Sequence, residues 1–135
     1  MDIADGTYNI TCASVGNPHC VVFCDDPSSL DLEKLGPKFE HAAYFPERIN
    51  TEFVRIVNDD DTLRMRVYER GNGETVACGT GACAAVIAAT ENGYVEKGKD
   101  ITVKLVGGDL VVNYSDHEVI LTGDAVMVYE GVVEY

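Results

Sequence analysis

The chain has no tryptophan, only four prolines and only 10 basic residues against 23 acidic ones, in a length of 135. The scarcity of proline, with a hydrophobic fraction of 46%, is typical of a globular domain rather than a disordered segment. The shortage of lysine and arginine leaves a net charge of -13, which repels phosphate backbones and anionic lipids. We therefore expect neither nucleic acid nor a membrane as a partner.

Long apolar runs are also missing. The longest, residues 82–89, is too short to span a bilayer, and no signal-peptide core follows Met1. The five cysteines are odd in number and lie in strand-like and helix-like segments, which indicates reduced thiols and a cytoplasmic location. The length predicts a single domain over residues 1–135.

The cysteine spacing does not favour a metal. On a strand, Cys20 and Cys24 would have Cα atoms about 13 Å apart, too far for one tetrahedral ion. At a helix start, Cys78 and Cys83 would point about 140° away from each other. The sequence predicts no metal site.

Short segments of alternating polarity predict a fold rich in strands. A short surface helix is expected at residues 31–39, limited by Gly36 and Pro37. Residues 58–61, of which the last three are aspartates, read as a solvated turn of a hairpin with one buried face, and Gly107-Gly108 as a second hairpin turn. The expected strands are residues 8–13, 19–24, 52–57, 63–67, 101–106, 110–114, 119–121 and 126–134.

One helix is strongly predicted, at residues 80–91, ended by Asn92-Gly93. Its segment from Ala82 to Ala89 is apolar on every side, so the helix must be covered on every side. Only strands are available to cover it. The pattern therefore predicts an α+β fold in which a curved, β-barrel-like sheet is wrapped around one central apolar helix.

Cys78 stands immediately before this helix. Unpaired N–H groups and the helix dipole lower the pKa of a thiol at a helix N-terminus. The N–H groups of Gly79 and Thr80 suit a carboxylate, which glycine allows to approach closely. A thiolate beside a bound carboxylate fits a base for the proton α to that carboxylate. The same residues also fit a plain tight turn with Cys78 as a small apolar side chain. Nucleotide binding is excluded, because no ribose-binding acid or Walker lysine follows.

Two separated motifs carry a resemblance to a known family. Glu69-Arg70-Gly71 followed by Ala77-Cys78-Gly79-Thr80-Gly81-Ala82-Cys83-Ala84, together with the upstream Val15-Gly16-Asn17-Pro18-His19-Cys20, resembles the C-terminal half of the diaminopimelate epimerase family. The resemblance extends through Ile49-Asn50 and covers the chain from about Tyr8 onward. Proline racemases and phenazine-type isomerases share the fold and a related turn, but we would not expect them to carry both motifs.

The resemblance implies a mixed, mostly antiparallel sheet that forms one of two pseudo-symmetric halves of an enzyme. It implies epimerisation of LL-2,6-diaminoheptanedioate to the meso form, in lysine and peptidoglycan precursor biosynthesis, without cofactor or metal. Two cysteines on opposite faces of the substrate act as base and acid. Cys78 matches one of them. The other belongs to an N-terminal domain that this chain does not contain, so we expect that domain as a partner and no activity from this chain alone.

The resemblance also assigns substrate contacts. Gly79 and Thr80 match backbone amides that hold the carboxylate at the reacting centre. Arg70 matches a residue that pairs with the distal carboxylate, helped by Asn17 and Asn50. Without the resemblance, Asn17-Pro18 would read as a turn and Asn50 as a cap or turn residue.

Two further residues match positions that tune the thiols. Glu69 corresponds to a residue near the substrate ammonium group and, with His19, to one that tunes the thiol pKa values. Alternatively, Glu69-Arg70 is a solvated strand end and His19 a structural histidine. The remaining cysteines are expected to have no chemical role; they are Cys12, Cys20, Cys24 and Cys83.

Other functions remain open. A thiol acyl-transferase or hydrolase would use Cys78 with His19 as base and Asn17 as orienting group. A non-catalytic amino-acid-binding module is the third reading. A homodimer that offers two Cys78 thiols to one site is less favoured, because the halves of the family differ in their substrate contacts. We expect instead an exposed apolar face that causes weak self-association.

Overall fold

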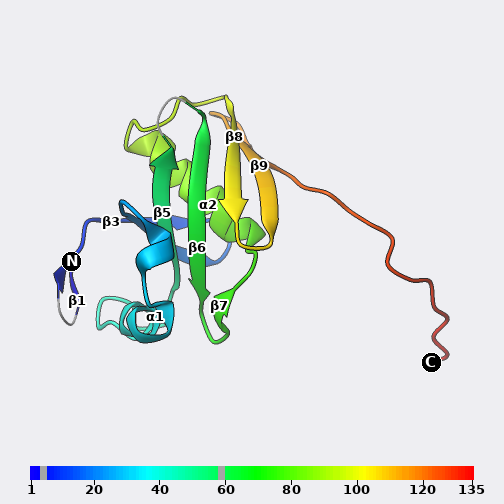
Figure 1. Cartoon of the computed structure of the whole chain (residues 1–135), viewed down its shortest axis with the longest axis horizontal. Coiled ribbons are helices and arrows are strands. Elements are labelled where there is room, and N and C mark those ends of the chain that lie inside the picture. Colours follow the sequence, from blue (N-terminus) through cyan, green and yellow to red (C-terminus); the bar gives the residue numbers. More distant parts are fainter. Residues whose placement is uncertain (4–5, 58–59) are drawn as a thin grey trace.

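The computed structural model describes residues 1–3, 6–57 and 60–135, and its main feature is one curled sheet with helices beside it (Figure 1). The strands of this sheet are β3 (Ile10–Ser14), β4 (Pro18–Phe23), β5 (Asn50–Val57), β6 (Thr62–Glu69), β7 (Gly73–Thr75), β8 (Asp100–Leu105), β9 (Gly108–Tyr114) and β10 (Val119–Thr122). The helices are the 3-10 turn η1 (Pro27–Ser29), α1 (Leu32–Glu40) and α2 (Gly79–Glu91). Two short strands, β1 (Asp2–Ile3) and β2 (Gly6–Thr7), pair separately.

The sheet runs in the order β10-β9-β8-β6-β5-β4-β3, and β7 pairs with β6. The β4–β5 and β6–β8 pairs are parallel, and the other pairs are antiparallel. Parallel neighbours need crossover connections, which α1 and α2 provide. The predicted α+β class with a curled, mixed sheet is confirmed.

The central strands are buried on both faces. Along β4 and β5, Val21 and Val54 join the core around α2, whereas Cys20 and Phe53 join a second core around α1. This division follows from the alternation of side chains along a strand. The α2 face of the sheet is the one that carries the candidate site.

Helix α2 forms as predicted. It begins at Gly79 and ends at Glu91, and the left-handed Gly93 follows with a φ of 77°. From Gly81 to Ala89, every side chain except that of Ile87 is buried. The helix packs against β3, β4, β5, β6, β8, β9 and β10.

One prediction about secondary structure, a strand at residues 126–134, is wrong. The helix predicted at residues 31–39 is confirmed as α1, which continues through Gly36 and Pro37 to Glu40. The side chain of Asp31 caps its first turn by accepting from the N–H of Lys34, and burial of Leu32 and Phe39 outweighs the missing proline donor. Residues 126–134 form no strand, because no neighbouring strand pairs with them, and they extend away from the domain (Figure 1).

Other differences are small. Strands β3 and β4 are displaced from the predicted segments by one or two residues, and the second hairpin turn falls at Val106-Gly107, with Gly108 already paired to Leu105. The first hairpin is confirmed, with Leu63, Met65 and Val67 on its buried face. Residues 58–59 of its expected turn lie outside the described residues.

Candidate active site

Cys78 is the N-cap residue of α2, with extended backbone angles. Its Sγ atom accepts a hydrogen bond from the N–H of Gly81 at 3.3 Å and lies 3.7 Å from Oγ1 of Thr80. The other N–H groups of this first turn have no acceptor within the helix. The half-buried thiol therefore lies beside a set of donors at the positive end of a helix.

The pKa of Cys78 is nevertheless raised, which is opposite to the direction predicted from the helix end alone. Burial is the main cause, and the carboxylate charge of Glu69 adds to it. The hydrogen bonds from Gly81 and Thr80 act in the other direction but are outweighed. In this chain, most Cys78 side chains are thiols rather than thiolates at neutral pH.

A chain of polar contacts leads from the thiol into the core. Nδ2 of Asn17 donates to Oγ1 of Thr80 at 3.2 Å. Oδ1 of the same amide lies 3.1 Å from Nε2 of His19. Nδ1 of His19 lies 2.6 Å from Oε1 of Glu52, and both of these side chains are fully buried. Four side chains are thus linked in a row that ends beside the thiol: Glu52, His19, Asn17 and Thr80.

Strand geometry explains this gathering. His19 shares a strand face with Val21, and Glu52 shares one with Val54, and both valines point toward α2. The parallel β4–β5 pairing sets Glu52 opposite Val21, one pleat along from His19. The two polar side chains therefore meet beneath the first turn of α2.

Glu52 was missed by the sequence analysis. Its position in the sequence carries a usable signal, because a carboxyl group on the same strand face as Val54 and Ile56 must be buried. A Cβ at Gly81 would lie 2.7 Å from Oε1 of Glu52 and 3.1 Å from Sγ of Cys78. Gly81 is therefore required so that the carboxyl group can approach the helix beneath the thiol.

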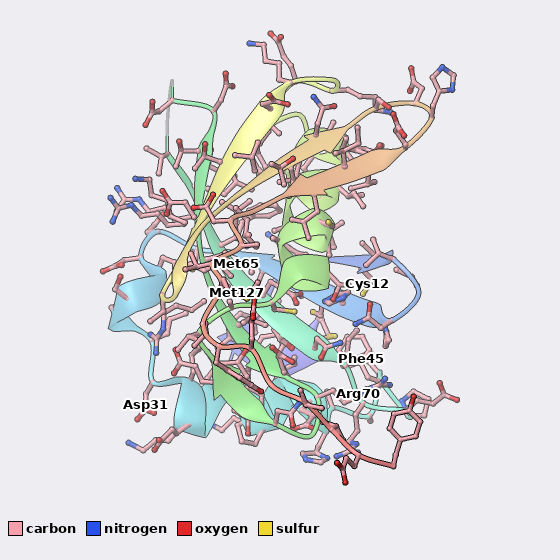
Figure 2. The ribbon with its side chains drawn as sticks, turned by 90° about the vertical axis from the view of Figure 1, so that its right-hand side faces the viewer. Cys12, Asp31, Phe45, Met65, Arg70 and Met127 are labelled. Carbon is pink, nitrogen blue, oxygen red and sulfur yellow. The ribbon has the colours of Figure 1, made fainter. Side chains whose placement is uncertain are left out.

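Asn50 and Arg70 form a second part of the site. Nδ2 of Asn50 donates to the carbonyl of Pro18, and its Oδ1 accepts from the backbone N–H of Arg70. The guanidinium of Arg70 donates to the carbonyl of Glu47 at 3.2 Å. Figure 2 shows Arg70 at the same edge of the molecule as Phe45. Asn50 thus joins the ends of β4 and β6, and Arg70 remains partly exposed.

Glu69 lies at the end of β6, on the face that carries Val67. Its Oε1 atom accepts a short hydrogen bond from Oγ1 of Thr75 on β7. Its charge acts on Cys78, where it raises the thiol pKa. The structure therefore brings all the predicted site residues to one end of α2 and the neighbouring strand ends.

No cluster of three or more His, Cys, Asp or Glu side chains in the described ranges could hold a metal ion. All five cysteines are free thiols. None of the helices that the structure describes is both long and apolar enough to cross a membrane.

Comparison with known proteins gives consistent matches. The family model described as diaminopimelate epimerase matches residues 11–128. A diaminopimelate epimerase of Methanococcus maripaludis is 49% identical over 132 residues, covering 96% of this chain and 47% of the relative. One from Bacillus cereus is 51% identical over 129 residues, covering 95% and 44%. The chain spans about half the length of these relatives.

Solved structures agree on the fold. A phenazine biosynthesis protein of the PhzF family from Bacillus anthracis superposes with a TM-score of 0.57 at 22% identity, covering 84% of this chain and 38% of that one. A predicted epimerase from Pseudomonas aeruginosa gives a TM-score of 0.53 at 18% identity, covering 77% and 35%.

Proposed function

Since the chain belongs to the diaminopimelate epimerase family, we propose that it supplies one of the two acid/base thiols for epimerisation of LL-2,6-diaminoheptanedioate to the meso form. The observation that carries the proposal is the position of Cys78, whose Sγ accepts the Gly81 N–H at the start of a buried helix. In this proposal the domain is one of two pseudo-symmetric halves, each built around a central apolar helix.

The proposed reaction needs no cofactor. One thiolate removes the α-proton from the LL substrate, and the electron pair left on carbon is delocalised into the bound carboxylate. The second thiol, on the opposite face, then donates its proton to the same carbon and becomes the thiolate. The N–H groups of Gly79 and Thr80 would hold the carboxylate on which charge develops, as donors at a helix N-terminus do.

The far end of the substrate is assigned to Arg70, Asn17 and Asn50. Arg70 is partly exposed and has further N–H groups beyond the one that binds Glu47, so its guanidinium can form a bidentate pair with a carboxylate. Asn17 is half-buried beside Thr80 and near the thiol. Asn50 already binds protein groups at both ends of its amide, so it would act mainly by holding the backbone of Arg70 in place. Glu69 would accept from the substrate ammonium and, with His19, tune the thiol.

The proposal includes inactivity of this chain alone, because inversion at carbon needs groups on both faces of the substrate. The other cysteines are poor candidates for the second group. Cys20 and Cys24 belong to the core around α1, on the opposite face of the sheet from Cys78, and Cys12 of β3 pairs with Cys20 of β4. Cys83 is buried in the apolar core around α2. The missing thiol would come from the other half found in full-length relatives.

An acyl-transferase or hydrolase based on Cys78 and His19 receives less support. Nδ1 of His19 faces Glu52 and Nε2 faces Asn17, so neither ring nitrogen is directed at the thiol. A cysteine hydrolase needs its histidine within hydrogen-bond reach of the nucleophile.

Release of the α-hydrogen from labelled diaminopimelate into solvent tests the proposal. We expect none from this chain, and measurable release when the N-terminal half of the Bacillus cereus relative is added. Cys78→Ser should abolish release in the mixture, whereas Cys83→Ser, five residues along the same helix, should retain most of it. Release in the mixture that survives Cys78→Ser would refute the role of Cys78. A mixture that stays inactive but binds the amino acid would favour the binding module.

A further inference from the structure

The buried carboxyl group of Glu52 has no role in the proposed reaction. Its side chain is fully buried, and Oε1 contacts only one ionisable partner, Nδ1 of His19, at 2.6 Å. Oε2 has no hydrogen-bond partner in the part of the chain that the structure describes. A buried carboxyl group with an unpaired oxygen is unusual, and this one lies beneath the turn of α2 that begins at Cys78, so its position requires an explanation.

The orientation of Asn17 fixes the protons of His19. Nδ2 of Asn17 points to Thr80, so Oδ1 faces Nε2 of His19. A carbonyl oxygen can only accept, and Nε2 must therefore carry a hydrogen. In a neutral ring Nδ1 is then an acceptor, so the hydrogen bond of 2.6 Å to Glu52 requires a proton on Oε1, whereas an ionised Glu52 would require hydrogens on both ring nitrogens.

The surroundings of Glu52 favour this protonated form. A charged oxygen without a donor is more costly in a core than the carbonyl oxygen of a neutral carboxyl group, and Oε2 is such an atom. Burial raises the pKa of Glu52, and the charge of Glu69 on β6 acts in the same direction. Cys20 on β4 lies near Glu52, and because its own pKa is raised it stays a neutral thiol that does not stabilise a charge on Glu52. His19 is the group whose hydrogen bond opposes these effects.

With Glu52 protonated, each hydrogen bond in the row from Glu52 to Thr80 is donated toward Cys78. Glu52 donates to His19, His19 to Asn17, and Asn17 to Thr80. The oxygen of Thr80 is then an acceptor from Asn17, so its own hydrogen is free to point at Sγ of Cys78, 3.7 Å away. If the pair lost that proton, Nε2 would accept, the amide of Asn17 would turn over, and Thr80 would donate to Asn17 instead.

We propose that Glu52 is a positioning residue whose retained proton directs the hydrogen bonds of His19, Asn17 and Thr80 toward Cys78, so that a Cys78 thiolate receives the Thr80 hydroxyl as well as the Gly81 N–H. The proposal rests on the acid/base role of Cys78 proposed above. It assigns a function to a carboxyl group that never touches the substrate.

The tautomer of His19 gives the first test. Nitrogen NMR of the histidine rings at neutral pH should show His19 neutral with its hydrogen on Nε2, in the wild type and in Glu52→Gln, whose amide can donate to Nδ1. A His19 ring with its hydrogen on Nδ1 alone, or with hydrogens on both nitrogens, would overturn the proposal.

Alkylation of Cys78 by iodoacetamide gives the second test, followed by mass spectrometry of the Cys78 peptide from pH 6 to 10. Glu52→Gln should follow the wild-type profile. Glu52→Leu, which cannot donate to His19, should react about tenfold more slowly near pH 8, since a hydrogen bond to a charged group is lost. Thr51→Val is the matched control, because it removes a neighbouring buried hydroxyl with no partner among the described residues, and its profile should not change.

Equal profiles for Glu52→Leu and the wild type would overturn the proposal, as would a Glu52→Gln profile as slow as that of Glu52→Leu. Neither readout depends on turnover. If alkylation responds to Glu52 as expected but hydrogen release fails in the reconstituted mixture, the epimerase proposal fails and the role of Glu52 stands. If hydrogen release succeeds in the mixture but alkylation does not respond to Glu52, only the role proposed for Glu52 is rejected.

Discussion

The aromatic ring of Tyr68 on β6 packs directly against Gly36 of α1, and a Cβ on Gly36 would lie 2.2 Å from two of the ring carbons. Real side chains do not approach so closely, so the ring and the helix backbone can meet only at glycine. This contact holds α1 on the face of the sheet opposite α2.

Gly36→Ala tests this contact. In an ordinary helix the change is stabilising by about 0.5–1 kcal/mol. Here we expect a loss of about 1–3 kcal/mol in the free energy of unfolding, because the methyl group overpacks the interface. Urea unfolding measures it. In a Tyr68→Ala background the same change should become neutral or stabilising, and a loss of equal size in both backgrounds would contradict the explanation.

Arg66 connects three parts of the chain. Its Nε and Nη2 atoms donate to the two carboxylate oxygens of Glu74 at 2.8 and 2.9 Å, and Nη1 donates to the carbonyls of Pro27 and Leu30. Lysine cannot reproduce this fork. Arg66→Lys should lower the free energy of unfolding by about 1–2 kcal/mol through the lost hydrogen bonds, despite partial exposure. Arg64→Lys, on an exposed neighbour in the same strand, should change it by less than about 0.5 kcal/mol.

Burial of the Cys20 thiol should make the protein less stable at alkaline pH. Burial raises the pKa of this thiol far above the ordinary value. The folded thiol stays protonated while the unfolded one ionises above about pH 8.5, so unfolding is favoured increasingly as pH rises.

The slope contributed by this one group is at most about 1.4 kcal/mol per pH unit. Between pH 8 and 10, Cys20→Ala should show a shallower decline than the wild type, although its stability is lower at pH 7. Val22→Ala on the same strand should lower stability without changing the slope. Parallel declines for the wild type and Cys20→Ala would contradict the assignment.

The C-terminal segment should contribute little to stability. Its large side chains are exposed, and Met127 lies on this extended tail in Figure 2. Removing residues 125–135 should leave the free energy of unfolding within about 0.5 kcal/mol of the full chain. Self-association measured by sedimentation across a concentration series should weaken, because the tail carries many of the exposed large apolar side chains.

A matched control keeps the length. Replacing Val126, Val128 and Val132 by serine should reduce association as the truncation does. If association is unchanged in both variants, another surface is responsible.

Local patterns predicted part of this structure well. The apolar segment that became α2, ended by Asn92-Gly93, and the β5–β6 hairpin are determined by side-chain periodicity and turn composition. The bounds of α1 were predicted to within one residue, but the packing of Tyr68 against Gly36 that holds this helix on the sheet was not. The strand expected at residues 126–134 is rich in valine, which favours strands, but it pairs with no strand among the residues that the structure describes.

The candidate site shows a similar division. Cys78 could be singled out from its place before a helix, and the other site residues from a resemblance. Glu52 could not be singled out in that way, because its importance depends on the β4–β5 register that places it beside His19. The raised pKa of Cys78 likewise depends mainly on burial of the thiol in the folded domain, which its place before a helix does not show.

The two parallel strand pairs have a consequence for the order of folding. The β4–β5 pair joins His19 to Asn50, and the β6–β8 pair joins Thr62 to Thr102, so both require long loops to close before they form. Helix α2 lies within the second loop, and its cover by β8, β9 and β10 is complete only when β8 reaches β6. During refolding we therefore expect the thiol of Cys78 to acquire its native reactivity in the last kinetic phase, after the β5–β6 hairpin has formed.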